Sequence, residues 1–283
     1  MNNTVTDTSG CSGCSGCGGS QRSGDKFCRS LTAPHRLSDV KRVVGIIGGR
    51  SGAGSSFVTA LLAAGMRQKG MSAAILDADI HTGTMPDMFE VTEKAVVTER
   101  GILPVKTKIG VELMSAALLF QNDAAARLSR SIAPGETAVH FWTHVIWRDA
   151  EVLFVDLPAG SEDTALAVFR FLPLDGLIVV LTPQHSASSA VEKITKTAEI
   201  MKIPVLGAVE NMVHFECPCC STRHRIFGGE TAREYPLRLL ARLPIDPALI
   251  KIAGGGHFDI FPNDRLDSLL RLLIDIPAYG GGL

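Results

Sequence analysis

The stretch "IIGGRSGAGSSF", residues 46–57, decides how this chain is expected to fold. A β-branched run at 42–48 precedes the glycines, and an apolar helical pattern at 55–70 follows them. Residues 49–56 fit G-x-x-x-x-G-K-[ST] with one mismatch, which is Ser55 in place of the lysine. A strand, a glycine-rich turn and a helix in this order predict a phosphate-binding loop. Such a turn can also be no more than a tight turn.

The loop keeps its backbone chemistry and loses one charge. Backbone N–H groups surround phosphate oxygens in such loops, and this needs glycines such as Gly49, Gly52 and Gly54. Ser56 stands where a hydroxyl ligand for Mg²⁺ is expected. The missing lysine ordinarily neutralises the β- and γ-phosphates, and its loss costs roughly 1.5–3 kcal/mol of binding. We therefore expect weak nucleotide binding and a larger loss of hydrolysis, whose transition state depends on that charge.

Strand and helix patterns alternate along the chain after residue 40. Strand patterns lie at 42–48, 72–79, 111–116, 150–160, 176–184, 204–212 and 239–246. Helical patterns lie at 55–70 and 188–202 and near the C-terminal end. This alternation predicts an α/β fold with a doubly wound, mainly parallel sheet, which binds ligands at the carboxyl ends of its strands. The loop and the polar side chains of Asp77, Asp79, Asp156 and Asn211 fall at those ends.

The composition and charge of the chain exclude some classes of function. The 283 residues are 46% hydrophobic, and a net charge of −1 offers no electrostatic basis for binding nucleic acid or an anionic membrane. No apolar run has the ~20 residues that a membrane helix needs, and the N-terminus lacks a signal-peptide pattern. We therefore expect a cytoplasmic protein. Residues 1–40 are rich in Gly, Ser and Cys and predict a flexible tail, with the domain at 41–283.

Cysteines are expected to be metal ligands or reactive thiols in that compartment. Cys217 and Cys220 form a C-x-x-C pair, with Cys219 between them. A [4Fe–4S] cluster or tetrahedral Zn²⁺ needs four soft ligands, and two pairs on the axis of a symmetric dimer would supply them. A zinc site and a redox dithiol remain open alternatives. The tail adds four candidate ligands, Cys11, Cys14, Cys17 and Cys28.

Several motifs in one order resemble the Mrp/ApbC-type iron–sulfur cluster carriers, a branch of the MinD/ParA-like P-loop ATPases. The loop "GRSGAGSS" stands where that family has G-K-G-G-V-G-K-[ST]. "DADIHTGTMP" at 77–86, "DLPAGSED" at 156–163 and "LTPQ" at 181–184 resemble the next three family segments. "VENMVHFECPCC" at 209–220, followed by "RIFGG" at 225–229, resembles its cysteine segment. The likeness runs from about residue 41 to 262.

The resemblance implies a role for each matching position. It implies a phosphate cradle made by Gly49, Arg50, Ser51, Gly52, Ala53, Gly54, Ser55 and Ser56. Asp79 would activate the attacking water, Asp156 would hold the Mg²⁺ shell with Asp77 beside it, and Asn211 would recognise adenine. Arg50 stands at the family's signature lysine, which reaches a partner's phosphates. An arginine there keeps the positive charge.

The resemblance also implies a function. The expected protein is a homodimer that holds a [4Fe–4S] cluster at Cys217 and Cys220 and passes it to apo iron–sulfur proteins. ATP with Mg²⁺ would control its conformation, and the degenerate loop predicts weak or absent ATP hydrolysis. One alternative is a scaffold that binds a cluster or zinc without using nucleotide. A positioning ATPase of the ParA/MinD type is disfavoured because no basic DNA-binding face or membrane-targeting helix is visible.

Overall fold

The computed structural model describes residues 29–79, 84–119, 134–159, 162–184, 189–217, 219–227, 237–258 and 266–277. Its centre is an eight-stranded sheet in the order β12-β9-β8-β1-β7-β2-β6-β5. Every pairing in this sheet is parallel except the one between β5 and β6 at one edge. The predicted α/β fold with a doubly wound, mainly parallel sheet is confirmed.

The elements follow one another in chain order. The strands of the large sheet are β1 (Val43–Gly48), β2 (Ala73–Asp77), β5 (Val105–Lys106), β6 (Glu112–Met114), β7 (Val152–Leu157), β8 (Gly176–Leu181), β9 (Val205–Glu210) and β12 (Leu239–Arg242). Two hairpins pair β3 (Val96–Thr98) with β4 (Gly101–Leu103) and β10 (Phe215–Glu216) with β11 (Arg223–His224). The helices are α1 (Ser55–Gln68), α2 (Thr84–Met88), α3 (Ala116–Leu119), α5 (Pro134–His144), α6 (Glu162–Phe171), α7 (Ser189–Ile200), α8 (Pro247–Gly254) and α9 (Asp267–Asp275).

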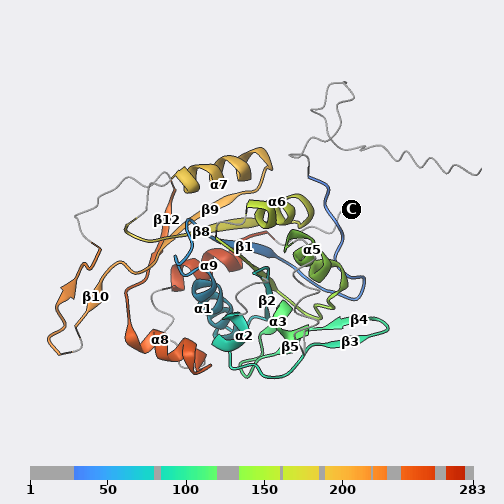
Figure 1. Ribbon diagram of the computed structural model, residues 1–283, viewed down its shortest axis with the longest axis horizontal. Helices are drawn as coiled ribbons and strands as arrows, with labels where there is room; N and C mark the ends of the chain where they lie inside the picture. Colours follow the sequence, from blue (N-terminus) through green and yellow to red (C-terminus); the bar gives the residue numbers. More distant parts are fainter. Residues whose placement is uncertain are drawn as a thin grey trace, which may run out of the picture.

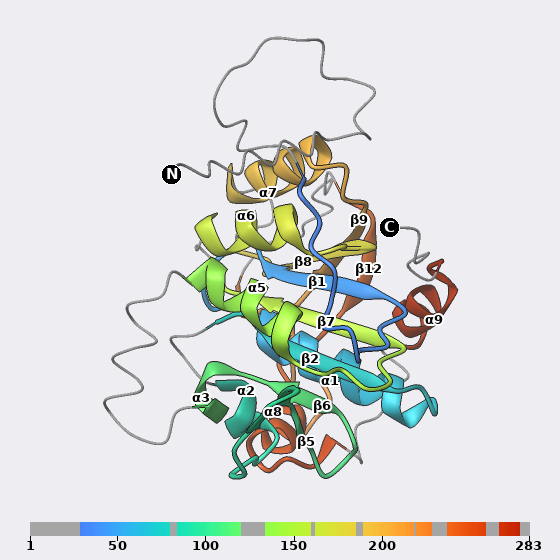
Figure 2. The same ribbon diagram turned by 90° about the vertical axis from the view of Figure 1, so that its right-hand side faces the viewer.

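Helices cover both faces of the sheet (Figures 1 and 2). Helices α5, α6 and α7 lie on one face, and α1, α8 and α9 pack on the other. Strand side chains alternate between the two cores, so in β1 Val44 and Ile46 face α1 while Val43 and Ile47 face the opposite layer. Every position is buried in β1, β2, β7 and β8, which explains why these strands are almost entirely apolar.

The chain before β1 lies against the domain. Thr32 donates its backbone N–H to the Phe171 carbonyl, and its own carbonyl accepts from the Trp142 indole at 2.7 Å. Ser38 Oγ donates to the Val145 carbonyl and accepts the Trp147 N–H. Through these contacts residues 29–40 pack on α5, α6 and the segment after α5, while the division into a tail at 1–40 and a domain at 41–283 stays a prediction. The tail cysteines Cys11, Cys14, Cys17 and Cys28 lie outside the described residues.

Candidate functional site

The glycine-rich loop connects the carboxyl end of β1 to the first residue of α1. Gly49 N–H donates to the Val180 carbonyl of β8 at 2.8 Å, which ties the start of the loop to the sheet. Gly52 and Gly54 have φ angles of +78° and +88°, in the left-handed region that favours glycine. Gly54 occupies the N-cap position of α1, which has no side-chain cap and no acidic residue in its first turn. The first turn of α1 therefore offers its positive dipole end to an anion.

The side chain of Asn211 is hydrogen-bonded to the glycine-rich loop. Its Nδ2 donates to the Ala53 carbonyl at 3.0 Å, and its Oδ1 accepts the Met212 N–H. A Cβ atom on Gly54 would lie 2.4 Å from the Asn211 Nδ2, so the loop and this amide fit together only with glycine there. The sequence implied an adenine contact for Asn211, which stays a prediction; the structure adds that the same side chain positions the loop.

Replacing Gly54 by alanine is expected to damage the loop more than replacing Gly52. Both substitutions put a side chain at positive φ, which costs about 1–2 kcal/mol. Only Gly54→Ala also pushes into Asn211, since a Cβ on Gly52 meets no atom within 4 Å. Denaturant unfolding of the two variants should show the larger loss of stability for Gly54→Ala. Equal losses would mean that the Asn211 contact does not hold the loop.

Two buried carboxylates lie side by side at the ends of neighbouring strands. Asp77 of β2 and Asp156 of β7 are register partners, and their side chains are 2% and 1% exposed. Asp156 Oδ1 accepts a hydrogen bond from Thr59 of α1 at 3.2 Å, and Asp77 Oδ1 accepts from the Asp79 N–H at 3.0 Å. Asp79 itself is half-buried. The carboxylates predicted from separate motifs are thus brought together next to α1.

Burial raises the pKa of both acids. The pKa of Asp156 rises to about 7 because the carboxyl is desolvated, although hydrogen bonds from Ser56 and Thr59 oppose the rise. The pKa of Asp77 lies well above its usual value because of burial and the nearby Asp156 charge. Asp77 Oδ2 has no hydrogen-bond partner among the described residues. The two carboxyl groups and the nearby hydroxyls of α1 are oxygen ligands of the kind that Mg²⁺ prefers. A bound Mg²⁺ would stabilise the ionised form of the pair.

Asp156→Asn is expected to stabilise the free protein at alkaline pH. A native pKa above the unfolded value means that stability is lost as pH rises from about 4 to the native pKa near 7. The amide removes this loss, so the gain in unfolding free energy should be larger at pH 8 than at pH 5 by roughly 2–3 kcal/mol. Denaturant unfolding without Mg²⁺ or nucleotide measures it. The same gain at both pH values would show that Asp156 does not titrate in this range.

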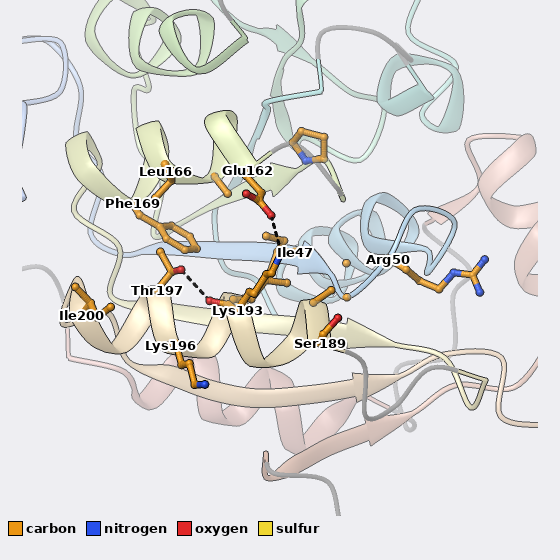
Figure 3. Close-up of a pocket in the computed structure, with 16 residues that line it drawn as sticks. Ile47, Arg50, Glu162, Leu166, Phe169, Ser189, Lys193, Lys196, Thr197 and Ile200 are labelled. Atoms are coloured by element: carbon orange, nitrogen blue, oxygen red, sulfur yellow. Dashed lines mark hydrogen bonds and ion pairs between the residues drawn. The ribbon is translucent and has the colours of Figure 1, made fainter. Parts of the chain in front are cut away.

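The two altered positions of the loop differ in their surroundings. Ser55 is half-buried as the first residue of α1. Arg50 is exposed, and its guanidinium donates to Gln184 Oε1 at 3.2 Å and to the Ser51 carbonyl. Figure 3 shows the Arg50 side chain directed away from the other labelled residues. Gln184 belongs to the "LTPQ" segment, so this contact joins the glycine-rich loop to a motif that lies far from it in the sequence.

A cavity of about 580 Å³ lies beside the loop, between α6 and α7. Its walls are largely apolar, with Phe169 from α6 and Ile200 from α7, and the Gly48–Arg50 backbone closes one end (Figure 3). Lys193 and Glu162 form an ion pair of 3.5 Å within it. Neither buried carboxylate lines this space, but Gly49 and Arg50 of the expected phosphate cradle do, so the cavity adjoins the expected nucleotide site. The sequence showed no signal for it, because most of its residues are ordinary positions of α6 and α7.

The cysteine pair lies on the β10–β11 hairpin. Cys217 N–H donates to the Thr222 carbonyl, and its own carbonyl accepts the Ser221 N–H, which closes the turn. Cys217 is half-buried, while Cys219 and Cys220 are exposed and none of the three forms a disulfide. The pKa of Cys220 is lowered by the Thr222 hydroxyl, which lies 3.3 Å from its sulfur, by the Thr222 backbone and by Cys217.

One copy of this hairpin carries fewer thiols than a four-sulfur metal shell needs. Across the described ranges, no three His, Cys, Asp or Glu side chains gather in a position to hold a metal ion. The two thiols of the C-x-x-C pair supply half of a four-sulfur shell. No helix in those ranges has the length and apolarity to cross a membrane.

The family described as "NUBPL iron-transfer P-loop NTPase", of the ParA group, matches residues 39–270. An iron-sulfur cluster carrier protein of Methanocaldococcus jannaschii is 34% identical over 216 residues, 74% of each chain. A cytosolic Fe-S cluster assembly factor, CFD1, of Chaetomium globosum is 35% identical over 80% of this chain and 82% of its own.

Solved structures agree with this grouping. A nucleotide-binding protein of Archaeoglobus fulgidus, solved with ADP, has a TM-score of 0.68 at 30% identity and covers 85% of this chain and 93% of its own. The cell division ATPase MinD of Pyrococcus furiosus shares the fold, with a TM-score of 0.60 at 18% identity over 83% of this chain and 98% of its own. The loop, the strand-end acids and the cysteine hairpin therefore have one explanation: the chain belongs to the iron-transfer P-loop NTPase family of iron–sulfur cluster carriers and assembly factors.

Proposed function

We propose that two copies of this chain hold a [4Fe–4S] cluster between their hairpins and transfer it to apo iron–sulfur proteins. The observation that carries the proposal is the pair of neighbouring thiols, Cys217 and Cys220, on a hairpin where the described residues gather no group of three metal-binding side chains. A two-fold axis through the cluster completes the four-sulfur shell. A cluster held at an exposed junction is also accessible to an acceptor.

Nucleotide is proposed to act as a conformational ligand rather than as a fuel. The loop, the N-terminus of α1 and the Asp77–Asp156 pair together suit the phosphates and Mg²⁺ of ATP. Ser55 leaves the β- and γ-phosphates without their usual lysine, so hydrolysis is slow or absent. Binding can still shift the dimer between two arrangements, to the extent that its affinity for them differs.

The segment from Asn211 to Cys217 connects the proposed nucleotide site to the proposed cluster site. Asn211 touches the loop, and six positions later the chain reaches Cys217. The intervening residues are held to the stretch after β12, with Val213 N–H donating to the Leu243 carbonyl and Ile245 N–H to the His214 carbonyl at 2.7 Å. A movement of the glycine-rich loop against Asn211 would be transmitted to the cysteine hairpin through this hydrogen-bonded segment.

A cluster-transfer assay tests the proposal. The anaerobically reconstituted protein is mixed with an apoenzyme whose activity requires a [4Fe–4S] cluster, with and without Mg²⁺–ATP. The activity of the acceptor should be restored in step with loss of cluster from this protein, and ATP should change the rate. Tight cluster retention with no transfer would contradict the carrier role. Transfer that ignores ATP, without saturable ATP binding, would favour the scaffold that works without nucleotide.

The expected setting is the cytoplasm. Relatives named as cytosolic assembly factors, from Chaetomium globosum and Caenorhabditis elegans, support this placement. The proposed partners are a second copy of the chain and the apo iron–sulfur proteins. The net charge of −1 offers no attraction for nucleic acid.

A further inference from the structure

Two histidines lie one helical turn apart on the outer surface of α5. His140 and His144 are both exposed, and their rings stack with centroids 3.9 Å apart at an angle of 23°. Residues at i and i+4 share one face of a helix, so the two imidazoles point to the same side. Metal–nitrogen bonds of about 2.0–2.1 Å place two ligating nitrogens about 3 Å apart.

Hydrogen-bond contacts orient the ring of His144. Its Nδ1 lies 3.2 Å from the His140 carbonyl oxygen, which accepts the Nδ1 proton in the tautomer that leaves Nε2 unprotonated. The Thr143 hydroxyl donates to the Val139 carbonyl at 2.9 Å and lies 2.8 Å from the same Nδ1, whose proton it can therefore accept. In that tautomer the unprotonated Nε2 of His144 is left as a ligand. Metal-binding histidines are commonly oriented in this way by a hydrogen bond from the other ring nitrogen.

His140 is also prepared to act as a ligand. No hydrogen bond to its ring nitrogens is present within the part of the chain that the structure describes. A neutral imidazole binds a metal ion through its unprotonated ring nitrogen.

We propose that His140 and His144 form a second metal site, which takes a divalent transition-metal ion with imidazole preference, such as Zn²⁺. No third metal-binding side chain converges on the pair among the described residues, so solvent completes the coordination shell. Open positions make this an exchangeable site rather than a closed structural one. The site is separate from the cysteine hairpin, because α5 contacts β2 whereas the hairpin follows β9, and these strands lie in different halves of the sheet.

A third histidine nearby does not belong to the site. His35 Nδ1 accepts the Leu37 N–H at 3.2 Å, so its proton is on Nε2. That Nε2 lies close to the Gly101 backbone, where a Cβ atom would be 3.1 Å away. Neither nitrogen of His35 therefore offers a free lone pair to an ion on α5.

Zinc titration of the histidine rings tests the proposal. The full chain, without an affinity tag and with its thiols alkylated, is followed by ¹H–¹³C NMR of the ring signals, which are assigned with single variants. Zn²⁺ should shift the His140 and His144 signals together and saturate at one ion per chain. His140→Gln and His144→Gln should each abolish the shift of the remaining ring. His257→Gln, at an exposed histidine on another element, is the matched control and should leave both shifts unchanged.

A positioning variant separates a built site from a chance pair. Thr143→Val keeps the side-chain shape and removes the hydroxyl that orients His144, so the apparent Zn²⁺ affinity should fall about tenfold or more. The proposal is overturned if the two rings shift only at millimolar Zn²⁺, or if they respond independently of each other. Loss of the site leaves the cluster assay unaffected, because that assay depends on Cys217 and Cys220.

Discussion

Cys217→Ala protein will fail to hold a cluster after anaerobic reconstitution, while Cys219→Ala protein will hold one. Cys217 and Cys220 are neighbours on the hairpin, and the proposed dimer would need all four of these sulfurs to complete the shell. Removing one thiol per chain leaves two ligands for the whole cluster. Absorption in the visible charge-transfer band, with iron and sulfide analysis, should show a near-complete loss for Cys217→Ala.

Cys219 is the matched control because it lies between the pair and is equally a thiol. It is exposed, and no contact of its side chain with either neighbour is seen in the described structure. The dimer should also weaken in Cys217→Ala, which sedimentation of the reconstituted protein can measure. Full iron and sulfide in Cys217→Ala would move the cluster to the tail cysteines Cys11, Cys14, Cys17 and Cys28. A monomer that keeps its cluster through the hairpin would contradict the shared site.

Ser55→Lys protein should hydrolyse ATP at least about a hundredfold faster than the unaltered protein. Ser55 is the first residue of α1, and the lysine of this loop ordinarily reaches the β- and γ-phosphates from there. A single well-placed group that stabilises transition-state charge contributes about 10²–10³ in turnover. Binding should also tighten, by roughly ten- to a hundredfold, since a charge-assisted hydrogen bond contributes about 1.5–3 kcal/mol. Phosphate release and ATP titration measure the two effects.

Two further variants make this result specific. Ser55→Ala changes the same position without adding a charge and should leave turnover at background. Asp79→Asn in the Ser55→Lys protein should remove the gain if Asp79 activates the attacking water, as proposed. Fast hydrolysis by the unaltered protein would mean that another cation replaces the lysine. Arg50 is the first to consider, because its contact with Gln184 is exposed and exchangeable.

Several structural features followed directly from local sequence patterns. The predicted strands all occur, because a run of β-branched and apolar residues buried on both faces has few alternatives to a central parallel strand. The glycine-rich loop could be predicted from the sequence because its backbone conformation needs glycine at Gly52 and Gly54. The predicted helix at 188–202 corresponds to α7. The short pairings in β3–β4 and β10–β11 were missed, since two or three residues carry too little pattern.

By itself the sequence determined the fold class, the order of the motifs and the set of chemical groups at the strand ends. These depend on residue type and on neighbours in the chain. The tertiary structure alone decided that Asp77 and Asp156 share one register, that Asn211 holds Ala53, and that His140 stacks on His144. It also decided that residues 29–40 lie on α5 and α6. Contacts between distant segments depend on packing geometry, which local patterns do not specify.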